Sequence, residues 1–157
     1  MPGQRQDHLL RQIELLRQFV ERIVRDHQPA QSDEALQLAL NLQERLFPVP
    51  VAEFLELTAL DQLHALTQHA LPDDANERCL TYIELLVHTA TIYELRGRDD
   101  LAHGARQLAV HLALLTVQHF PSPEARRVVG LLRGMLAPAE LHAPVRQLLE
   151  SFDATGD

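Results

Sequence analysis

Histidines are the side chains of this chain that most directly suggest chemistry, because nine of them occur among 157 residues. The spacings in which a helix usually presents metal ligands, His-x-x-x-His, His-Glu-x-x-His and Glu-x-x-His, do not occur in the sequence. His103, His111 and His119 recur every eight residues, which turns each side chain about 80° around a helix from the previous one. One ion therefore cannot gather all three.

Two acid–histidine pairs do share a helical face, Asp61 with His64 and Glu84 with His88. Either pair could be half of a metal or acid–base site that another helix completes. Such pairs are also common as exposed neighbours or as local hydrogen bonds without a metal. A helical-bundle metal protein or enzyme built on these four residues is therefore the alternative hypothesis, and the favoured interpretation includes no metal and no cofactor.

Nucleophiles are few and lack evident partners. Cys79, the only cysteine, lies several residues inside an expected helix and has no evident general base, so we expect a buried, inert thiol. Ser32 and Ser122 are expected to cap helices. The chain has neither a lysine nor a glycine-rich phosphate loop. We therefore predict no catalytic residue, and a non-enzymatic role is favoured.

Composition and charge narrow the classes of protein further. The net charge of −8 and the lack of a basic stripe argue against binding to duplex nucleic acid, where phosphate neutralisation dominates affinity. No long uncharged apolar stretch or signal-peptide core occurs, so we expect neither a membrane span nor secretion. A lone cysteine fits a reducing compartment. These features predict a cytoplasmic protein.

The elements that must position these side chains are expected to be helices, within a single domain covering residues 1–157. Leucine is abundant, glycine is scarce, and no segment alternates cleanly between apolar and polar residues. The sequence predicts an all-α fold of seven or eight helices in successive antiparallel hairpins.

The first expected helix runs from Gln4 to His27, and its apolar positions step by four and three residues. That stripe predicts either a helix packed in the domain core, which is favoured, or the seam of a homodimer. Residues 28–32 are expected to form a loop, with Ser32 or Asp33 capping a second helix that ends near Phe47. The apolar positions are Leu9, Ile13, Leu16, Val20 and Ile23, widened by Leu10 and Val24.

Residues that typically begin or end helices predict four further helices. Val51 to Leu57 is expected to form one or two turns, and Thr58 caps a helix through Ala70. A long helix from Asp73 or Asp74 to Arg96 has an acidic first turn, and Gly97 suits the left-handed position that follows a helix. The next helix runs from Asp99 or Asp100 to about Phe120.

The C-terminal region is expected to hold two more helices. Ser122 and Pro123 begin one of them as cap and first helical residue. The last begins near Pro138, is kinked or split at Pro144, and frays over residues 153–157. Gly130 and Gly134 are expected at helical positions four apart, a spacing that predicts close packing against another helix inside the domain, with an oligomer contact as the alternative.

One expected hairpin, about residues 82 to 115, resembles a tetratricopeptide repeat. Small residues in such a unit let the two helix backbones approach closely. The match is partial, because Arg106 stands where the motif has an aromatic residue and no proline ends the unit at the expected place. The matching positions are Ala90, Tyr93, Gly97, Ala102 and Ala109.

Over its whole length the chain also resembles a family of small uncharacterised bacterial helical proteins. The shared features are a first helix like that of residues 6–14 and a later hairpin like that of residues 92–97. The resemblance implies a fold and no known activity, while tetratricopeptide-like folds mostly bind proteins or peptides in a groove.

These observations predict a protein–protein interaction module, most simply a homodimer, that binds a protein or peptide between hairpins. Arginines near the hairpin turn could hold a partner's carboxylate through bidentate hydrogen bonds. The residues predicted to contact a partner are Tyr93, Arg96, Arg98, His103 and Arg106.

Overall fold

The computed structural model describes the backbone of residues 2–155 and the side chains of residues 8–155. Within this range all regular structure is helical and no strand occurs, which confirms the all-α prediction. Residues 156–157 of the segment expected to fray lie outside the described residues. The helices are α1 (Pro2–Asp26), α2 (Ser32–Leu46), α3 (Val51–Leu55), α4 (Ala59–Thr67), α5 (Pro72–Leu95), α6 (Asp99–His119), α7 (Pro123–Leu132) and α8 (Ala143–Ala154), with 3-10 turns η1 (Pro29–Gln31) and η2 (Pro138–Glu140).

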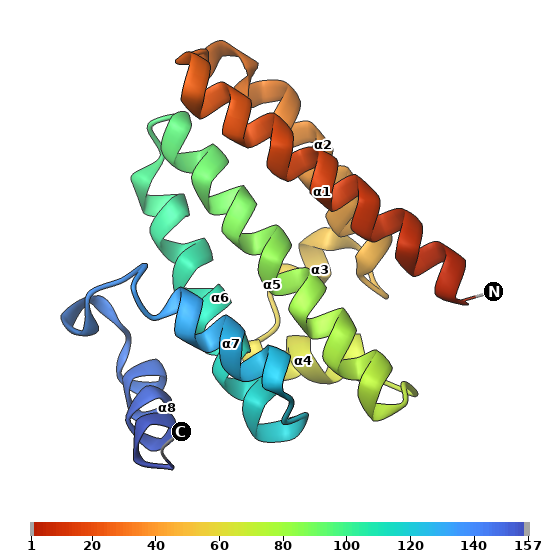
Figure 1. The fold of residues 1–157 in the computed structure, drawn as a ribbon, viewed down its shortest axis with the longest axis vertical. Helices are drawn as coiled ribbons and strands as arrows, with labels where there is room; N and C mark the ends of the chain where they lie inside the picture. Colours follow the sequence, from red (N-terminus) through yellow and green to blue (C-terminus); the bar gives the residue numbers. More distant parts are fainter. Residues whose placement is uncertain (1, 156–157) are drawn as a thin grey trace.

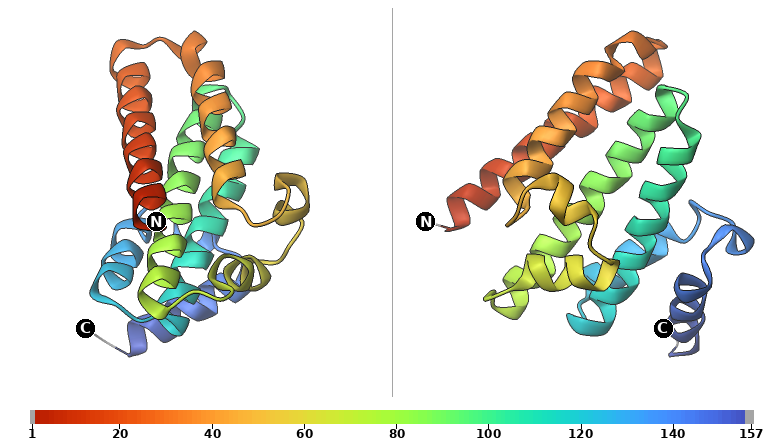
Figure 2. Two further views of the ribbon diagram at one scale, coloured as in Figure 1. Left: turned by 90° about the vertical axis from the view of Figure 1, so that its right-hand side faces the viewer. Right: turned by 180° about the vertical axis from the view of Figure 1, so that it is seen from behind.

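Two antiparallel hairpins dominate the arrangement, α1 with α2 and α5 with α6 (Figure 1). The α5–α6 pair makes the most extensive helix contact, and α5 also packs against both α1 and α2. The short helix α4 and the helix α7 lie on opposite sides of the α5–α6 hairpin, and α8 packs on α6 (Figure 2). The helices within each of these two hairpins are therefore antiparallel, as predicted.

Helix α5 joins two buried clusters, which explains why it is apolar around most of its circumference. On one side Leu85 and Ile92 pack with α1 and α2. On the other side Tyr82 and Leu86 pack with α3, α4, α6, α7 and α8. The ring of Tyr82 meets the stacked pair of Phe47 and Phe54 edge-on, with ring centroids 5.1 and 5.6 Å away.

The apolar stripe of α1 belongs to the domain core, as the favoured interpretation predicted. Ile13, Leu16, Val20 and Ile23 are all buried against α2 and α5. Val24, expected at the edge of the same stripe, remains 47% exposed. The edge of the predicted stripe is therefore at the surface, and Leu15, which lies outside the stripe, is also 61% exposed.

Local capping signals place several helix ends correctly. The hydroxyl of Thr58 accepts a hydrogen bond from the backbone N–H of Asp61, and that of Ser122 accepts one from Ala125. Pro123 occupies the first turn of α7. Gly97 has a φ of 75°, the left-handed conformation predicted for it.

The predicted cap of the second helix is wrong. Ser32 is buried and already helical, because Pro29 starts a 3-10 turn that runs directly into α2. The backbone N–H of Ser32 donates to the carbonyl of Pro29, so no side-chain cap forms at Gln31. Residues 28–32 are therefore not a plain loop. Helix α4 also ends at Thr67 rather than Ala70.

The last helix is split, as predicted, but the break comes before Pro144. The region consists of η2 and α8, and Pro144 lies in the first turn of α8, where its missing N–H costs no helical hydrogen bond. Helix α8 then continues to Ala154 instead of fraying from residue 153. The guanidinium of Arg133 makes two hydrogen bonds to the Asp153 carboxylate, at 2.8 and 2.9 Å, which ties this end to the segment after α7.

The predicted packing role of the two spaced glycines is also wrong. Gly130 and Gly134 are exposed, and a Cβ atom at either would meet nothing within 4 Å. Helix α7 ends at Leu132, so Gly134 lies beyond it and the two glycines do not share a helical face. Leu131 beside them is 70% exposed.

Candidate functional site

The arginines predicted to contact a partner all pair with carboxylates of this chain. Arg96 forms an ion pair with Asp33 of α2, and Arg106 pairs with Glu94 of α5. The guanidinium of Arg98 makes two hydrogen bonds to Asp100, at 3.1 and 3.2 Å, at the start of α6. Tyr93 is half-buried on α5. These side chains gather near the α5–α6 turn, where the ion pairs of Arg96 and Arg106 join neighbouring helices.

His103 points to a different neighbour from the arginines. Its Nδ1 lies 3.9 Å from Glu140 of η2, and its Nε2 lies 3.3 Å from Nε2 of Gln107. Its ring centroid lies 6.4 Å from that of His142. The predicted set is thus split between the hairpin turn and the junction of α6 with the C-terminal segment.

The two acid–histidine pairs do not converge on one site. Glu84 and His88 of α5 lie 3.5 Å apart on the side that faces α1. His64 of α4 instead approaches His119 of α6, with ring centroids 6.1 Å apart. Among the residues that the structure describes, no group of three or more His, Cys, Asp or Glu side chains could hold a metal ion.

A groove runs between α1 and α5 on the side of the molecule where the Glu84–His88 pair lies. Its cavity measures about 370 Å³. Apolar side chains of Val20 and Val24 line it together with the polar groups of His88 and Thr91. We call this feature the α1–α5 groove; its lining residues are Arg17, Val20, Glu21, Val24, Arg25, His88 and Thr91.

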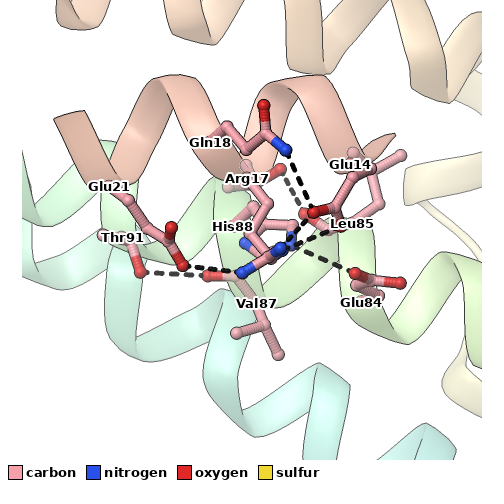
Figure 3. A network of polar contacts seen from close by, with 10 residues as sticks. Glu14, Arg17, Gln18, Glu21, Glu84, Leu85, Val87, His88 and Thr91 are labelled. Carbon is pink, nitrogen blue, oxygen red and sulfur yellow. Dashed lines mark hydrogen bonds and ion pairs between the residues drawn. The ribbon is translucent and has the colours of Figure 1, made fainter. Parts of the chain in front are cut away.

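Ion pairs along α1 organise the charged edge of the α1–α5 groove. Figure 3 shows the Arg17 guanidinium between two carboxylates, with hydrogen bonds of 2.9 Å to Glu14 and 2.8 Å to Glu21. The hydrogen bond from Arg17 is the main reason that the pKa of Glu14 lies below its usual value. All three side chains stay partly exposed, so the pairs fix geometry more than they stabilise the fold.

Carboxylates outnumber arginines around this groove once the ion-pair partners of its lining residues are counted. The lining itself holds two arginines, Arg17 and Arg25, and one carboxylate, Glu21, and the partners add three more carboxylates. The groove and its rim together therefore hold more carboxylates than arginines, in agreement with the net charge of the whole chain. The four acidic residues are Glu14, Glu21, Asp26 and Glu84.

From the sequence, Val20, Val24 and His88 were singled out but not brought together. Glu14, Arg17 and Glu21 are spaced three or four residues apart, as ion pairs along one helix require. The residues His88 and Thr91 come from α5, some seventy positions further along the chain. No pattern in the sequence specifies the register in which α1 docks on α5, so the groove could not have been found from it.

Comparisons with known proteins add no assignment, since no family model, curated protein or solved structure matches the chain. Within the described part of the chain, none of the helices is both long and apolar enough to cross a membrane.

Proposed function

We propose that this chain is a protein-interaction module that binds a basic amphipathic segment of a partner protein in the α1–α5 groove. The observation that carries the proposal is the combination of an apolar lining with an excess of carboxylates around it. A segment with apolar side chains on one face and Arg or Lys on its flanks complements both features. The proposal includes the cytoplasmic location expected from the sequence.

The apolar part of the groove supplies the surface that a partner would cover. Val24 is 47% exposed although it continues the buried stripe of α1. Val20, one turn earlier, is buried and forms the inner end of this apolar strip. Covering Val24 would remove apolar area from water, which is favourable at about 25 cal/mol for each Å² buried.

The charge around the groove determines which partner segments it favours. Glu21 and Glu84 are 62% and 44% exposed at their side chains, so an incoming cation can reach them without displacing the protein core. Exposed charge pairs add little affinity individually, but complementary charge favours the correct partner and speeds association. An acidic segment would meet the same carboxylates and be repelled.

The finer structural expectations are part of this proposal. The α5–α6 hairpin would act as the single tetratricopeptide-like unit, and its motif positions Ala90, Ala102 and Ala109 are buried. The residues that the sequence analysis predicted to contact a partner include three arginines, which pair with carboxylates of this chain. These residues would therefore form a secondary binding surface beside the α5–α6 turn. They are Tyr93, Arg96, Arg98, His103 and Arg106.

The test is binding of two labelled synthetic helical peptides that share one leucine face and differ only in carrying lysine or glutamate on the other. Fluorescence anisotropy should show that the lysine peptide binds and that salt weakens its binding, since exposed charges are screened within about 10 Å at 0.1 M. Equal binding of both peptides, or binding of neither, would overturn the proposal. Sedimentation without peptide tests whether a second copy of the chain occupies the groove instead. A homodimer that forms with the unaltered chain but not with Val24→Asp would assign the groove to that second copy.

Matched variants locate the binding surface. Val24→Asp should abolish binding of the lysine peptide, whereas Leu131→Asp places the same charge on another exposed apolar residue and should leave it unchanged. Glu84→Gln should weaken binding a few-fold by removing one carboxylate. Loss of binding in Leu131→Asp but not in Val24→Asp would move the site from α1 to α7.

A further inference from the structure

The side chain of Gln107 fastens the C-terminal segment to α6. Gln107 is buried, with 4% of its surface exposed. Its Nε2 donates a hydrogen bond to the carbonyl of Glu140 at 2.5 Å, and its Oε1 accepts one from the backbone N–H of His142 at 3.2 Å. We call this pair of bonds the Gln107 clamp. It holds both ends of the turn that leads from η2 into α8.

The hydrogen positions within the Gln107 clamp follow from its partners. Rotating the amide by 180° would place Oε1 against the carbonyl of Glu140 and the NH2 group against the N–H of His142, losing both bonds. The second hydrogen on Nε2 is then left for Nε2 of His103, 3.3 Å away. That ring nitrogen can accept only when His103 is neutral and carries its proton on Nδ1, the atom on the Glu140 side.

We propose that the Gln107 clamp is a pH-sensitive latch, in which protonation of His103 at Nε2 releases η2 and α8 from α6. A proton on Nε2 turns this acceptor into a donor, so two N–H groups face each other across 3.3 Å. Relief requires His103 or the amide of Gln107 to move. Movement of the amide breaks the bonds to Glu140 and His142 together.

Charged groups on every neighbouring element act on His103 and on the Gln107 clamp. Glu140 of η2 lies on the Nδ1 side of His103 and attracts an imidazolium there, so this ion pair opposes release. His142, at 6.4 Å, and the half-buried His111 on α6 add further positive charge when they bind protons. Arg146 of α8 already places its guanidinium on the carbonyls of Pro138 and Leu141.

Two acidic residues and one further cation complete the surroundings on α6 itself. Asp99 lies one turn before His103, in the first turn of α6, and Asp100 is held by Arg98. Arg106 is held by Glu94 of α5. Acidification therefore gathers positive charge on the α6–η2 junction while its carboxylates on α6 stay exposed or paired elsewhere.

Release of the latch would uncover part of the core. Leu141, Val145 and Leu149 of the C-terminal segment are buried in the larger apolar cluster, which also contains Leu114 of α6. These contacts oppose release, so the latch changes the stability of one segment and leaves the α5–α6 hairpin in place. The inference concerns a different part of the molecule from the α1–α5 groove and stands or falls separately.

The test is amide hydrogen exchange of the whole chain at about pH 7.5 and about pH 5.5, which bracket the titration of an ordinary histidine. After correction for the intrinsic pH dependence, residues 138–154 should exchange about fivefold to thirtyfold faster at the lower pH, the factor expected for one or two lost hydrogen bonds. Amides of α5 should keep their protection. Equal protection of residues 138–154 at both pH values would overturn the proposal.

Variants assign the effect to one histidine. His103→Gln offers Gln107 an acceptor that does not titrate, so the pH-dependent difference should disappear. His8→Gln removes an exposed histidine of α1 and should leave the difference intact. A His103→Gln variant that keeps the full pH response would exclude His103 as the trigger.

A measurement on the unaltered chain covers the case in which His103→Gln fails to fold. The side-chain amide resonances of Gln107 should shift with pH along the same curve as the ring resonances of His103. Independent curves for the two side chains would contradict the latch even if the segment loosened at low pH for another reason.

Discussion

The hydroxyl of Tyr82 on α5 donates a hydrogen bond to Oε1 of Gln62 on α4 over 3.2 Å, and both side chains are buried. The amide nitrogen of Gln62 in turn donates to the carbonyl of Leu57 at 3.2 Å. Burial raises the pKa of Tyr82, so its hydroxyl stays protonated and remains a donor. A polar chain thus passes through the larger apolar core and joins α5 to α4 and the turn before it.

Tyr82→Phe should destabilise the fold by about 1–2 kcal/mol, because it leaves the buried oxygen of Gln62 without its donor. Urea unfolding followed by circular dichroism measures the difference. Tyr93→Phe is the matched control, since Tyr93 is only half-buried and water can reach it. A loss of the same size in both variants would mean that the hydroxyl of Tyr82 contributes nothing specific.

Gly97→Ala should destabilise the fold by about 1–2 kcal/mol, because an L side chain is strained at a φ of 75° even though the space around it is open. Gly104→Ala is the control of opposite sign. Gly104 lies inside α6 with open space around it, so alanine should stabilise the helix there by about 0.5–1 kcal/mol. Thermal unfolding of both variants tests the pair, and a neutral Gly97→Ala would contradict the argument from backbone strain.

Cys79 should react slowly with iodoacetamide. Burial raises the pKa of its thiol to about 11, so at about pH 8 the native chain holds roughly two orders of magnitude less thiolate than an ordinary cysteine. Mass spectrometry of the alkylated chain measures the rate with and without urea. A Ser151→Cys variant supplies an exposed thiol for comparison. Equal rates for the two thiols in the native chain would show that Cys79 is accessible.

The stability of the fold should fall as the pH drops below about 6.5, the ordinary pKa of histidine. Burial, and secondarily the nearby His142, lower the pKa of His111 in the folded state. As the pH falls, the unfolded chain therefore binds this proton at a higher pH than the folded chain does. The contribution of His111 to stability is complete above the pKa of the unfolded state and declines as the pH falls toward the pKa of the folded state.

Urea unfolding at about pH 7.5 and about pH 5.5 tests this sign, with an ordinary histidine titrating between the two. His111→Gln should lose less stability on acidification than the unaltered chain, because the variant has one fewer buried group to protonate. His8→Gln should behave like the unaltered chain. A steeper loss in His111→Gln would mean that the sign of the effect is reversed.

Helix ends were the most predictable features, because they depend on residues close together in the sequence. Thr58 and Ser122 cap the helices expected of them, and Gly97 adopts the conformation that only glycine adopts easily. The errors at Ser32 and Gly134 also arose from local structure. A 3-10 turn replaced the predicted cap of α2 at Ser32, and α7 ended before it reached Gly134. The apolar stripe of α1 was read correctly as core.

The candidate sites depended on contacts that no local pattern encodes. Gln107 lies thirty-three positions from Glu140, and nothing in either neighbourhood marks the bond between them. Arg96, which was predicted to contact a partner, pairs with Asp33 of α2, and no local pattern marks this ion pair. The acid–histidine pairs separated for the same reason, because α4 and the middle of α5 face different helices.

The sequence by itself determined that the chain is helical, where most of its helices begin and end, and which face of α1 is buried. Those features follow from backbone preferences and from apolar periodicity, which act over a few residues. The tertiary structure alone decided that Val24 stays exposed in the groove that His88 also lines and that Gln107 bonds to Glu140. Helix docking fixes such pairs, because the angle and register of two packed helices arise from the fit of many side chains at once.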